Sequence, residues 1–309
     1  MRWLWLPCLV AVVLPAPAPA QDRPAGPAVP PGVAYHRDLT YCTVGKTDLR
    51  LDLALPKDGK GPFPCVVCVH GGGWHLGTRK SYTQTVLALA RRGYVAATVS
   101  YRLSPASRFP AQINDVKCAV RWLRAHAEQY HIDKDRIGAL GESAGGHLVC
   151  LLATTTKQDG LEGDGGCADQ PSKVCCAVAW YPPTDLTHAH EAIRSPSAPV
   201  LEAMYARKAV EDLLGGPPEK AGRECYAKAS PVTYVKKGAA PTLCVHGTAD
   251  SLVPIGQSKL LEKKLKEAGV ECRLCPIAKA GHGFRGKDRE AALKASFEFL
   301  DEHLKQAKR

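Results

Sequence analysis

Short apolar runs alternate with amphipathic stretches along most of this chain. Residues 65–69 (CVVCV) are continuously apolar and lead into three glycines, a pattern typical of a strand buried on both faces. In residues 112–128 the apolar positions recur at helical spacing, which predicts an amphipathic helix. The same patterns predict further strands in 94–101, 135–141, 175–183, 241–247 and 270–277, and further helices in 82–93, 143–155, 255–269 and from about 288.

This alternation determines the expected fold class. A strand followed by a helix and another strand forms a crossover connection, and such connections build a mostly parallel α/β sheet with helices on both faces. Two strands near 36–43 and 48–55 precede the alternating region. The stretch 184–230, rich in proline, histidine and alanine, interrupts the rhythm and predicts a short cap insertion over one end of the sheet. We therefore expect one α/β domain over residues 35–309.

The N-terminal residues have a different composition. A basic residue, Arg2, precedes the apolar run WLWLPCLVAVVL, and the segment then ends in small residues at Ala20. This three-part pattern predicts an export signal over residues 1–20, with cleavage near Ala20 and a periplasmic or secreted product. Residues 21–34, rich in proline, alanine and glycine, are expected to form an extended linker. No other stretch reaches 18 apolar residues, so no integral membrane segment is expected after signal removal.

The formal net charge of +11 changes this picture little. The excess of lysine and arginine is spread over predicted helices such as 259–269 and is not collected in one basic block. A solvated surface with weak attraction to acidic polymers accounts for the pattern, and no nucleic-acid partner is predicted. Nothing in the sequence specifies an oligomeric state.

The 13 cysteines raise the question of disulfides or a metal site. Cys65 and Cys68 lie in one predicted strand, where residues three apart point to opposite faces, and the C-x-x-C at 272–275 has the same setting. Neither pair suits a redox or zinc motif, so most cysteines are expected in the core. One disulfide remains possible among four cysteines in or beside predicted loops: Cys167, Cys175, Cys176 and Cys225. His188 and His190 would diverge on a helix, and no metal or cofactor is predicted.

The candidate chemistry begins at residues 141–145 (GESAG). Ser143 follows a predicted strand and opens a predicted helix, the context in which such a serine becomes a nucleophile. The flanking glycines suit a tight turn that a side chain would obstruct, and the helix N-terminus favours developing negative charge. The motif alone is weak, because a helix-capping serine also explains Ser143, although not its glycine neighbours.

Three consecutive glycines, residues 71–73, follow the apolar strand at 65–69. At this position they would expose backbone N–H groups to a bound molecule and form an oxyanion hole for acyl transfer. A phosphate-binding loop is the competing interpretation, but no G-K-[ST] sequence follows.

Two further polar residues follow predicted strands: Asp250 comes after 241–247, and His282 comes after 270–277. The carboxyl ends of parallel strands meet at one edge of a sheet, so both residues are expected near Ser143. A nucleophilic serine needs a base, and the base needs a carboxylate that holds its tautomer. We therefore predict a catalytic triad of Ser143, His282 and Asp250. Asp185 is the alternative acid.

These motifs together resemble a known family. The chain is similar to the α/β-hydrolases of the hormone-sensitive-lipase-like and acetyl-esterase group, particularly the BD-FAE esterases. The resemblance covers about residues 35–306 and rests on HGGGW, YRLSPASRFPA, GESAGG, HGTADSLVP and AGHGF. It implies an α/β-hydrolase fold whose catalytic domain spans residues 35–309, with a short cap.

The resemblance also implies a role for each matched residue. Ser143 would be the nucleophile, His282 the general base and acid, and Asp250 its orienting partner. An oxyanion hole and a pocket wall complete the expected site, formed by the backbone N–H groups of Gly72, Gly73 and Ala144 and by the side chain of Trp74.

The expected function is that of a serine carboxylesterase that hydrolyses short-chain acyl esters through an acyl-enzyme. The cap at 184–230 is short and not strongly apolar, which disfavours a large lipid-accepting lid. Export and the family resemblance imply acetyl or feruloyl esters of plant polysaccharides. The expected partner is thus a small-molecule or carbohydrate-linked ester.

Three alternatives stay open. An arylformamidase-like amidase would share the fold and triad, but it would act in the cytoplasm, where an export signal has no use. A prolyl-oligopeptidase-like serine peptidase would share the catalytic domain, but the 309 residues leave no room for its propeller. A non-catalytic binding protein on this scaffold would usually have lost a triad residue, whereas all three are present here.

Overall fold

The computed structural model describes residues 28–187 and 200–305. The predicted export signal, the first part of the predicted linker and residues 188–199 of the predicted cap lie outside the described residues. Within the two described ranges, none of the helices is both long and apolar enough to cross a membrane.

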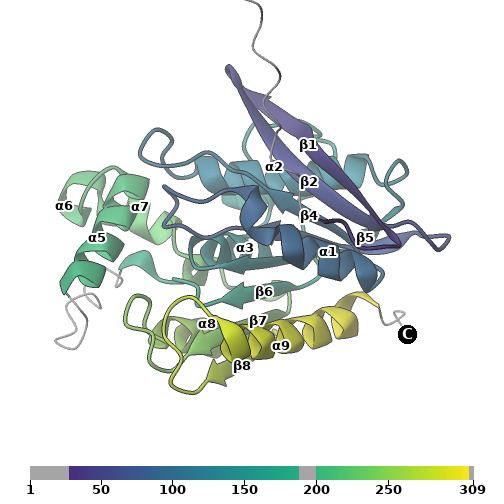
Figure 1. Ribbon diagram of the computed structural model, residues 1–309. Helices are drawn as coiled ribbons and strands as arrows, with labels where there is room; N and C mark the ends of the chain where they lie inside the picture. The colour runs from purple at the N-terminus through teal and green to yellow at the C-terminus, as the bar shows by residue number, and fades with distance from the viewer. Residues whose placement is uncertain (1–27, 188–199, 306–309) are drawn as a thin grey trace, which may run out of the picture.

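One eight-stranded sheet organises the described chain (Figure 1). Its strand order is β1-β2-β4-β3-β5-β6-β7-β8, with β1–β2 and β2–β4 antiparallel and the other neighbouring pairs parallel. The mostly parallel sheet predicted from the sequence is therefore confirmed. The strands are β1 (Val33–Val44), β2 (Thr47–Pro56), β3 (Phe63–Val69), β4 (Val95–Val99), β5 (Ile132–Glu142), β6 (Ala177–Trp180), β7 (Thr242–Gly247) and β8 (Cys272–Ile277).

Helices cover both faces of this sheet, each through its own apolar core. Helices α1 and α9 pack on one face, and α2, α3 and α8 pack on the other. Helix α9 runs along the front of the view in Figure 1. The arrangement is the α/β-hydrolase fold. The helices are α1 (Thr83–Arg91), α2 (Ala111–Ala125), α3 (Ala144–Thr154), α8 (Gly256–Glu267) and α9 (Gly286–Leu304).

The apolar strand β3 contributes to both cores because its side chains alternate between the two faces. Cys65 packs into the core beneath α2 and α3, whereas Cys68 packs into the core beneath α1 and α9. Both thiols are fully buried, and burial raises the pKa of Cys65 to about 12. Every cysteine within the described ranges is unpaired; seven of these twelve are buried in the core, and the other five are partly exposed.

The first strand begins earlier than the predicted end of the linker at residue 34. Val33 opens β1, is 1% exposed and joins the core beneath α1 and α9. Its burial explains the difference, because a proline-rich composition does not reveal that a single valine reaches the core. The predicted helix at 112–128 is also shorter, since α2 ends at Ala125.

The described part of the predicted insertion at 184–230 includes the helices α5, α6 and α7, at one end of the molecule (Figure 1). The longest, α5, contributes Ala209, Val210 and Leu213 to the core beneath α3. The helical segment is thus anchored to the domain by apolar packing. The three helices are α5 (Val200–Leu214), α6 (Pro218–Ala221) and α7 (Arg223–Lys228).

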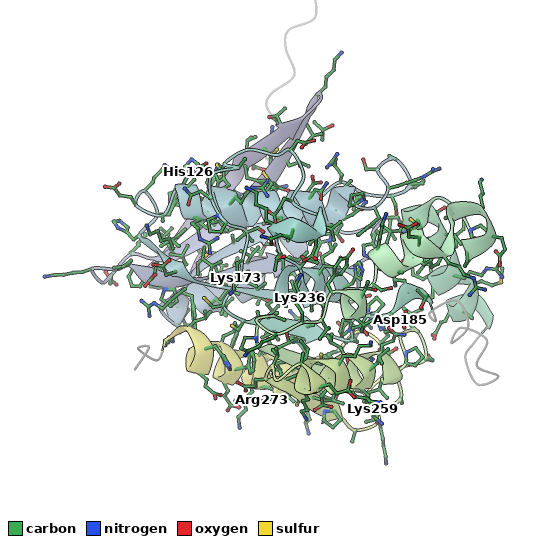
Figure 2. All side chains as sticks on the ribbon, turned by 180° about the vertical axis from the view of Figure 1, so that it is seen from behind. His126, Lys173, Asp185, Lys236, Lys259 and Arg273 are labelled. Atoms are coloured by element: carbon green, nitrogen blue, oxygen red, sulfur yellow. The ribbon has the colours of Figure 1, made fainter. Side chains whose placement is uncertain are left out.

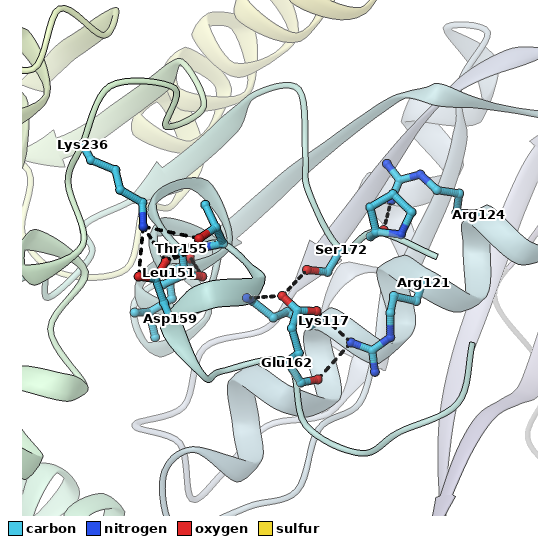
Figure 3. A network of polar contacts seen from close by, with 11 residues as sticks. Lys117, Arg121, Arg124, Leu151, Thr155, Asp159, Glu162, Ser172 and Lys236 are labelled. Atoms are coloured by element: carbon cyan, nitrogen blue, oxygen red, sulfur yellow. Dashed lines mark hydrogen bonds and ion pairs between the residues drawn. The ribbon is translucent and has the colours of Figure 1, made fainter. Parts of the chain in front are cut away.

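A buried ion network stabilises the loop between α3 and β6 (Figure 3). Lys117 and Arg121, one turn apart on α2, both bind the Glu162 carboxylate, at 2.7 and 3.1 Å. Ser172 donates a third hydrogen bond to the same carboxylate, at 2.8 Å. Burial alone would raise the pKa of Glu162, but the hydrogen bond and charge of Lys117 outweigh it and lower that pKa. Glu162 is therefore the counter-charge for two buried cations.

Glu162→Gln should destabilise the fold by about 3 kcal/mol at pH 7, because it leaves two buried cations without a counter-charge. The folded-state pKa of Glu162 is lowered, so its carboxylate stabilises the fold above its unfolded pKa of about 4.3. That contribution is lost as the pH falls through the folded pKa, and the difference between wild type and variant should shrink on acidification. Urea unfolding at several pH values measures both effects.

Glu267→Gln is the matched control, because Glu267 forms only an exposed pair with Lys263 at 3.9 Å. Its unfolding free energy should stay within about 0.5 kcal/mol of wild type. Equal stabilities for the two variants would contradict the role given to Glu162.

Candidate active site

Ser143 occupies a sharp turn between the end of β5 and the start of α3. Its backbone has φ 52° and ψ −120°, a conformation that costs a non-glycine residue on the order of 1–3 kcal/mol. Two hydrogen bonds hold it there: the Ser143 N–H donates to the Trp180 carbonyl of β6, and the His147 N–H donates to the Ser143 carbonyl, both at 2.9 Å. The neighbouring strand and the helix therefore fix the strained turn.

The glycines of GESAG are required by close approaches of the backbone. A Cβ atom at Gly141 would lie 2.4 Å from the Gly145 carbonyl oxygen, and one at Gly145 would lie 2.1 Å from the Val69 carbonyl oxygen. Neither position has space for a side chain. The helix N-terminus can reach the end of β3 only because these residues are glycines.

The three predicted triad residues come together at the carboxyl edge of the sheet. Ser143 Oγ lies 3.0 Å from His282 Nε2, and His282 Nδ1 lies 2.8 Å from Asp250 Oδ2. The residues follow β5, β8 and β7, three strands far apart in the sequence. The arrangement is a continuous chain of hydrogen bonds from carboxylate to imidazole to hydroxyl.

Asp250 is buried but remains ionised. Burial alone would raise its pKa, but hydrogen bonds from His246 and His282 and from the Val253 N–H outweigh this effect and lower the pKa to about 2. The Leu252 and Val253 N–H groups donate to Oδ1 at 3.0 and 2.9 Å, which leaves Oδ2 directed at His282. This carboxylate can therefore fix the orientation of the imidazole and balance a positive charge on it.

The alternative acid, Asp185, has other partners. Its Oδ1 accepts a hydrogen bond from the Thr187 N–H at 2.9 Å, and its carbonyl accepts one from Gln257. It lies beside the helical insertion (Figure 2). The geometry thus pairs His282 with Asp250 and favours the first of the two predicted acids.

The loop after β3 carries the glycines predicted for an oxyanion hole. Gly72 has φ +108°, and a Cβ there would lie 2.3 Å from the Leu76 carbonyl oxygen, so a glycine is needed. Its own carbonyl accepts the N–H groups of His75 and Leu76, which closes a tight turn. Gly72, Gly73 and Ala144 all line the cavity that holds Ser143. Among the residues that the structure describes, no acceptor is hydrogen-bonded to their three backbone N–H groups.

Trp74 borders the cavity as predicted, but its indole points inward and has a structural partner. The Trp74 Nε1–H donates to His147 Nδ1 at 3.2 Å, and His147 Nε2 donates to the Ala229 carbonyl at 2.7 Å. Complete burial lowers the pKa of His147 to about 4, so the ring stays neutral with its proton on Nε2. His147 thus connects the glycine loop to the base of the helical insertion, a role that the sequence did not reveal.

The cavity around Ser143 has a volume of about 440 Å³ and two chemically different ends. An apolar end is formed by Tyr205, Ala206, Ala209 and Val210 of α5 and by Leu252, Val253 and Pro254. A polar end is formed by Glu142, Tyr181, Arg285 and Arg289. Tyr181, which sequence analysis also missed, lies 4.5 Å from the His282 ring and donates its hydroxyl to Glu142 at 3.0 Å.

No metal site accompanies this cavity: among the described residues, no group of three His, Cys, Asp or Glu side chains is arranged to hold a metal ion. His188 and His190, which the sequence did not favour as ligands, lie outside the described residues. The arrangement of Ser143, His282 and Asp250 is suited to acyl transfer by a serine nucleophile.

Two solved structures with a similar architecture are named as esterases. A truncated carbohydrate esterase from gut microbiota has a TM-score of 0.77 and 26% sequence identity, covering 88% of this chain and 97% of that one. A propionate-bound esterase from Thermogutta terrifontis has a TM-score of 0.73 and 28% identity, covering 90% of this chain and 97% of that one.

Two relatives in sequence are also named as ester hydrolases. The probable carboxylic ester hydrolase LipM of Mycobacterium tuberculosis is 31% identical over 77% of this chain and 53% of its own length. The esterase LipQ of the same organism is also 31% identical, over 77% of this chain and 54% of its own length. The chain thus spans about half the length of these curated relatives.

The family assignment rests on a match between this chain and a family model. The BD-FAE family model matches residues 51–265, which run from within β2 to near the end of α8 and include Ser143 and Asp250. Together with the α/β-hydrolase fold, this match shows that the chain belongs to the BD-FAE family.

Proposed function

We propose that this protein is a serine carboxylesterase that hydrolyses short-chain acyl esters through an acyl-enzyme intermediate. The observation that carries the proposal is the hydrogen-bond chain from Asp250 through His282 to Ser143, with N–O distances of 2.8 and 3.0 Å. The relatives named carboxylic ester hydrolase and esterase support the same reaction.

In the first half-reaction, Ser143 Oγ attacks the ester carbonyl while its proton passes to His282 Nε2. The carbonyl oxygen becomes an oxyanion, which the N–H groups of Gly72, Gly73 and Ala144 would bind. The bond to the alcohol then breaks, and the alcohol leaves with the proton from His282. The acyl group stays on Ser143.

In the second half-reaction, His282 takes a proton from water, and the resulting nucleophile attacks the acyl-enzyme. The oxyanion forms again in the same place, and its collapse returns the proton to Ser143 Oγ and releases the carboxylic acid. Asp250 stays ionised throughout, consistent with its pKa of about 2, and balances the charge on the imidazolium.

The apolar end of the cavity suits a short acyl chain. Tyr205 and Val210 of α5 and Leu252 surround it, and the whole cavity has a volume of about 440 Å³. Thermogutta terrifontis esterase structures contain propionate and butyrate. The similarity to a carbohydrate esterase supports acetyl or feruloyl esters of polysaccharides as natural substrates.

Ser143→Ala should abolish hydrolysis of p-nitrophenyl acetate, because it removes the hydroxyl that carries the acyl group in this mechanism. Asp250→Asn should lower kcat about 10⁴-fold, because an amide cannot hold the required tautomer of His282. Kinetic assays measure the activity of both variants, and circular dichroism measures their folding. Ser81→Ala, an exposed serine outside the cavity, is the control and should match wild type. A folded Ser143→Ala enzyme with wild-type turnover would end the proposal.

A series of p-nitrophenyl esters should give kcat/KM values that rise from acetate to butyrate and then fall by more than about tenfold at octanoate. Each buried methylene contributes about 0.8 kcal/mol until the apolar end is filled. Leu252→Ala should move the optimum to a longer chain, because it removes part of the wall. A flat profile up to octanoate in wild type would contradict this assignment of the acyl site.

A further inference from the structure

The two ends of the catalytic cavity belong to opposite faces of the sheet. Ala209 and Val210 at the apolar end are part of the core beneath α3, whereas Tyr181 and Phe284 near the polar end are part of the core beneath α9. Ser143 lies between them, at the end of a central strand. A substrate bound at Ser143 therefore extends toward both cores and meets a different chemistry on each side.

The polar end carries a net positive charge. Apart from His282, the charged side chains that line the cavity are Glu142, Arg285 and Arg289. Two guanidinium groups thus face one carboxylate, and that carboxylate already accepts the Tyr181 hydroxyl at 3.0 Å. Arg285 is the extended N-cap residue of α9 and Arg289 lies in the first turn of that helix, and both line the cavity.

Among the residues that the structure describes, these two arginines have fewer polar partners than several other arginines of the chain. Arg79, Arg102 and Arg121 each bind a carboxylate. By contrast, neither Arg285 nor Arg289 forms an ion pair with any residue that the structure describes. Arg289 lies over the Trp180 ring at 5.6 Å and makes one long hydrogen bond, of 3.4 Å, to Thr85 Oγ1. A planar guanidinium with free donors is suited to carboxylate, phosphate or sulfate groups.

The alcohol portion of the ester must lie at the polar end of the cavity, next to His282. In the proposed mechanism His282 Nε2 protonates the leaving alcohol, so the alcohol oxygen lies next to His282. Arg285 follows His282 by three residues, and the Tyr181 ring packs on His282 at 4.5 Å. The groups beyond His282 therefore contact the alcohol, while the acyl chain extends toward α5.

We infer that Arg285 and Arg289 form a subsite for a negatively charged group on the alcohol portion of the ester. The inference rests on the proposed esterase function and narrows it to a substrate class: short-chain acyl esters of alcohols that carry a carboxylate, phosphate or sulfate. Acylated acidic saccharides have this chemistry. Arg285 is exposed and Arg289 is half-buried, so the subsite is open to solvent. A large alcohol portion could therefore extend out of the cavity.

Two nearly isosteric esters test the inference. 4-Acetoxybenzoate carries a negative charge on its alcohol portion, whereas 4-acetoxybenzamide has the same shape without the charge. The kcat/KM of each ester is divided by its rate of alkaline hydrolysis, which corrects for the different leaving groups. Wild type should prefer the anion by about tenfold at low salt, because hydrogen bonds to charged groups are the stronger ones. The preference should fall as salt screens the open subsite.

Arg285→Gln and Arg289→Gln should each reduce this preference, and the double variant should bring the ratio close to one. Lys287→Gln is the matched control, because Lys287 lies between the two arginines in sequence but does not line the cavity. Like each arginine substitution, Lys287→Gln removes one positive charge from the start of α9. Its anion-to-neutral ratio should therefore equal that of wild type.

Three results would overturn the inference while leaving the esterase proposal intact: a wild-type ratio of one or less, a double variant with an unchanged ratio, or a Lys287→Gln enzyme that loses the preference equally. The last result would assign the preference to the general charge of the protein. If wild type hydrolysed neither of the two test esters nor p-nitrophenyl acetate, the proposed function itself would be overturned.

Discussion

The candidate active site depends on one backbone contact, the close approach of the start of α3 to the end of β3. Gly145 faces the Val69 carbonyl so closely that a Cβ would lie 2.1 Å from its oxygen. This approach brings the Ala144 N–H beside the glycine loop that follows β3 and forces Ser143 into its strained turn. The nucleophile and the donors proposed for the oxyanion are thus positioned by the same packing constraint, before any substrate binds.

The surroundings of the titratable groups near this contact determine which of those groups are charged. Asp250 receives enough hydrogen bonds to stay ionised although buried, with a pKa of about 2. His147 has no charged partner in its hydrogen bonds and is fully buried, and its pKa falls to about 4. His147 is therefore a fixed neutral connector between Trp74 and Ala229, whereas the partly exposed His282 contacts both the Asp250 carboxylate and the Ser143 hydroxyl.

The sequence predicted the sheet and the three central residues because these depend on local patterns. Apolar runs identified the strands, and Ser143, Asp250 and His282 stand directly after three of them. The rest of the site depends on contacts between distant segments. His147 binds partners 73 and 82 residues away, and Arg289 reaches the cavity only because α9 packs beside β6. Periodicity also could not reveal that Val33 is buried, since its neighbours have the composition of a linker.

The most direct test of the account is the covalent labelling of the nucleophile. Diethyl p-nitrophenyl phosphate reacts with a serine that a neighbouring base activates, and peptide mass spectrometry locates the phosphoryl group. The account predicts one adduct per chain, on Ser143, formed in step with loss of esterase activity. Labelling of a different residue, or full inactivation with Ser143 unmodified, would contradict it.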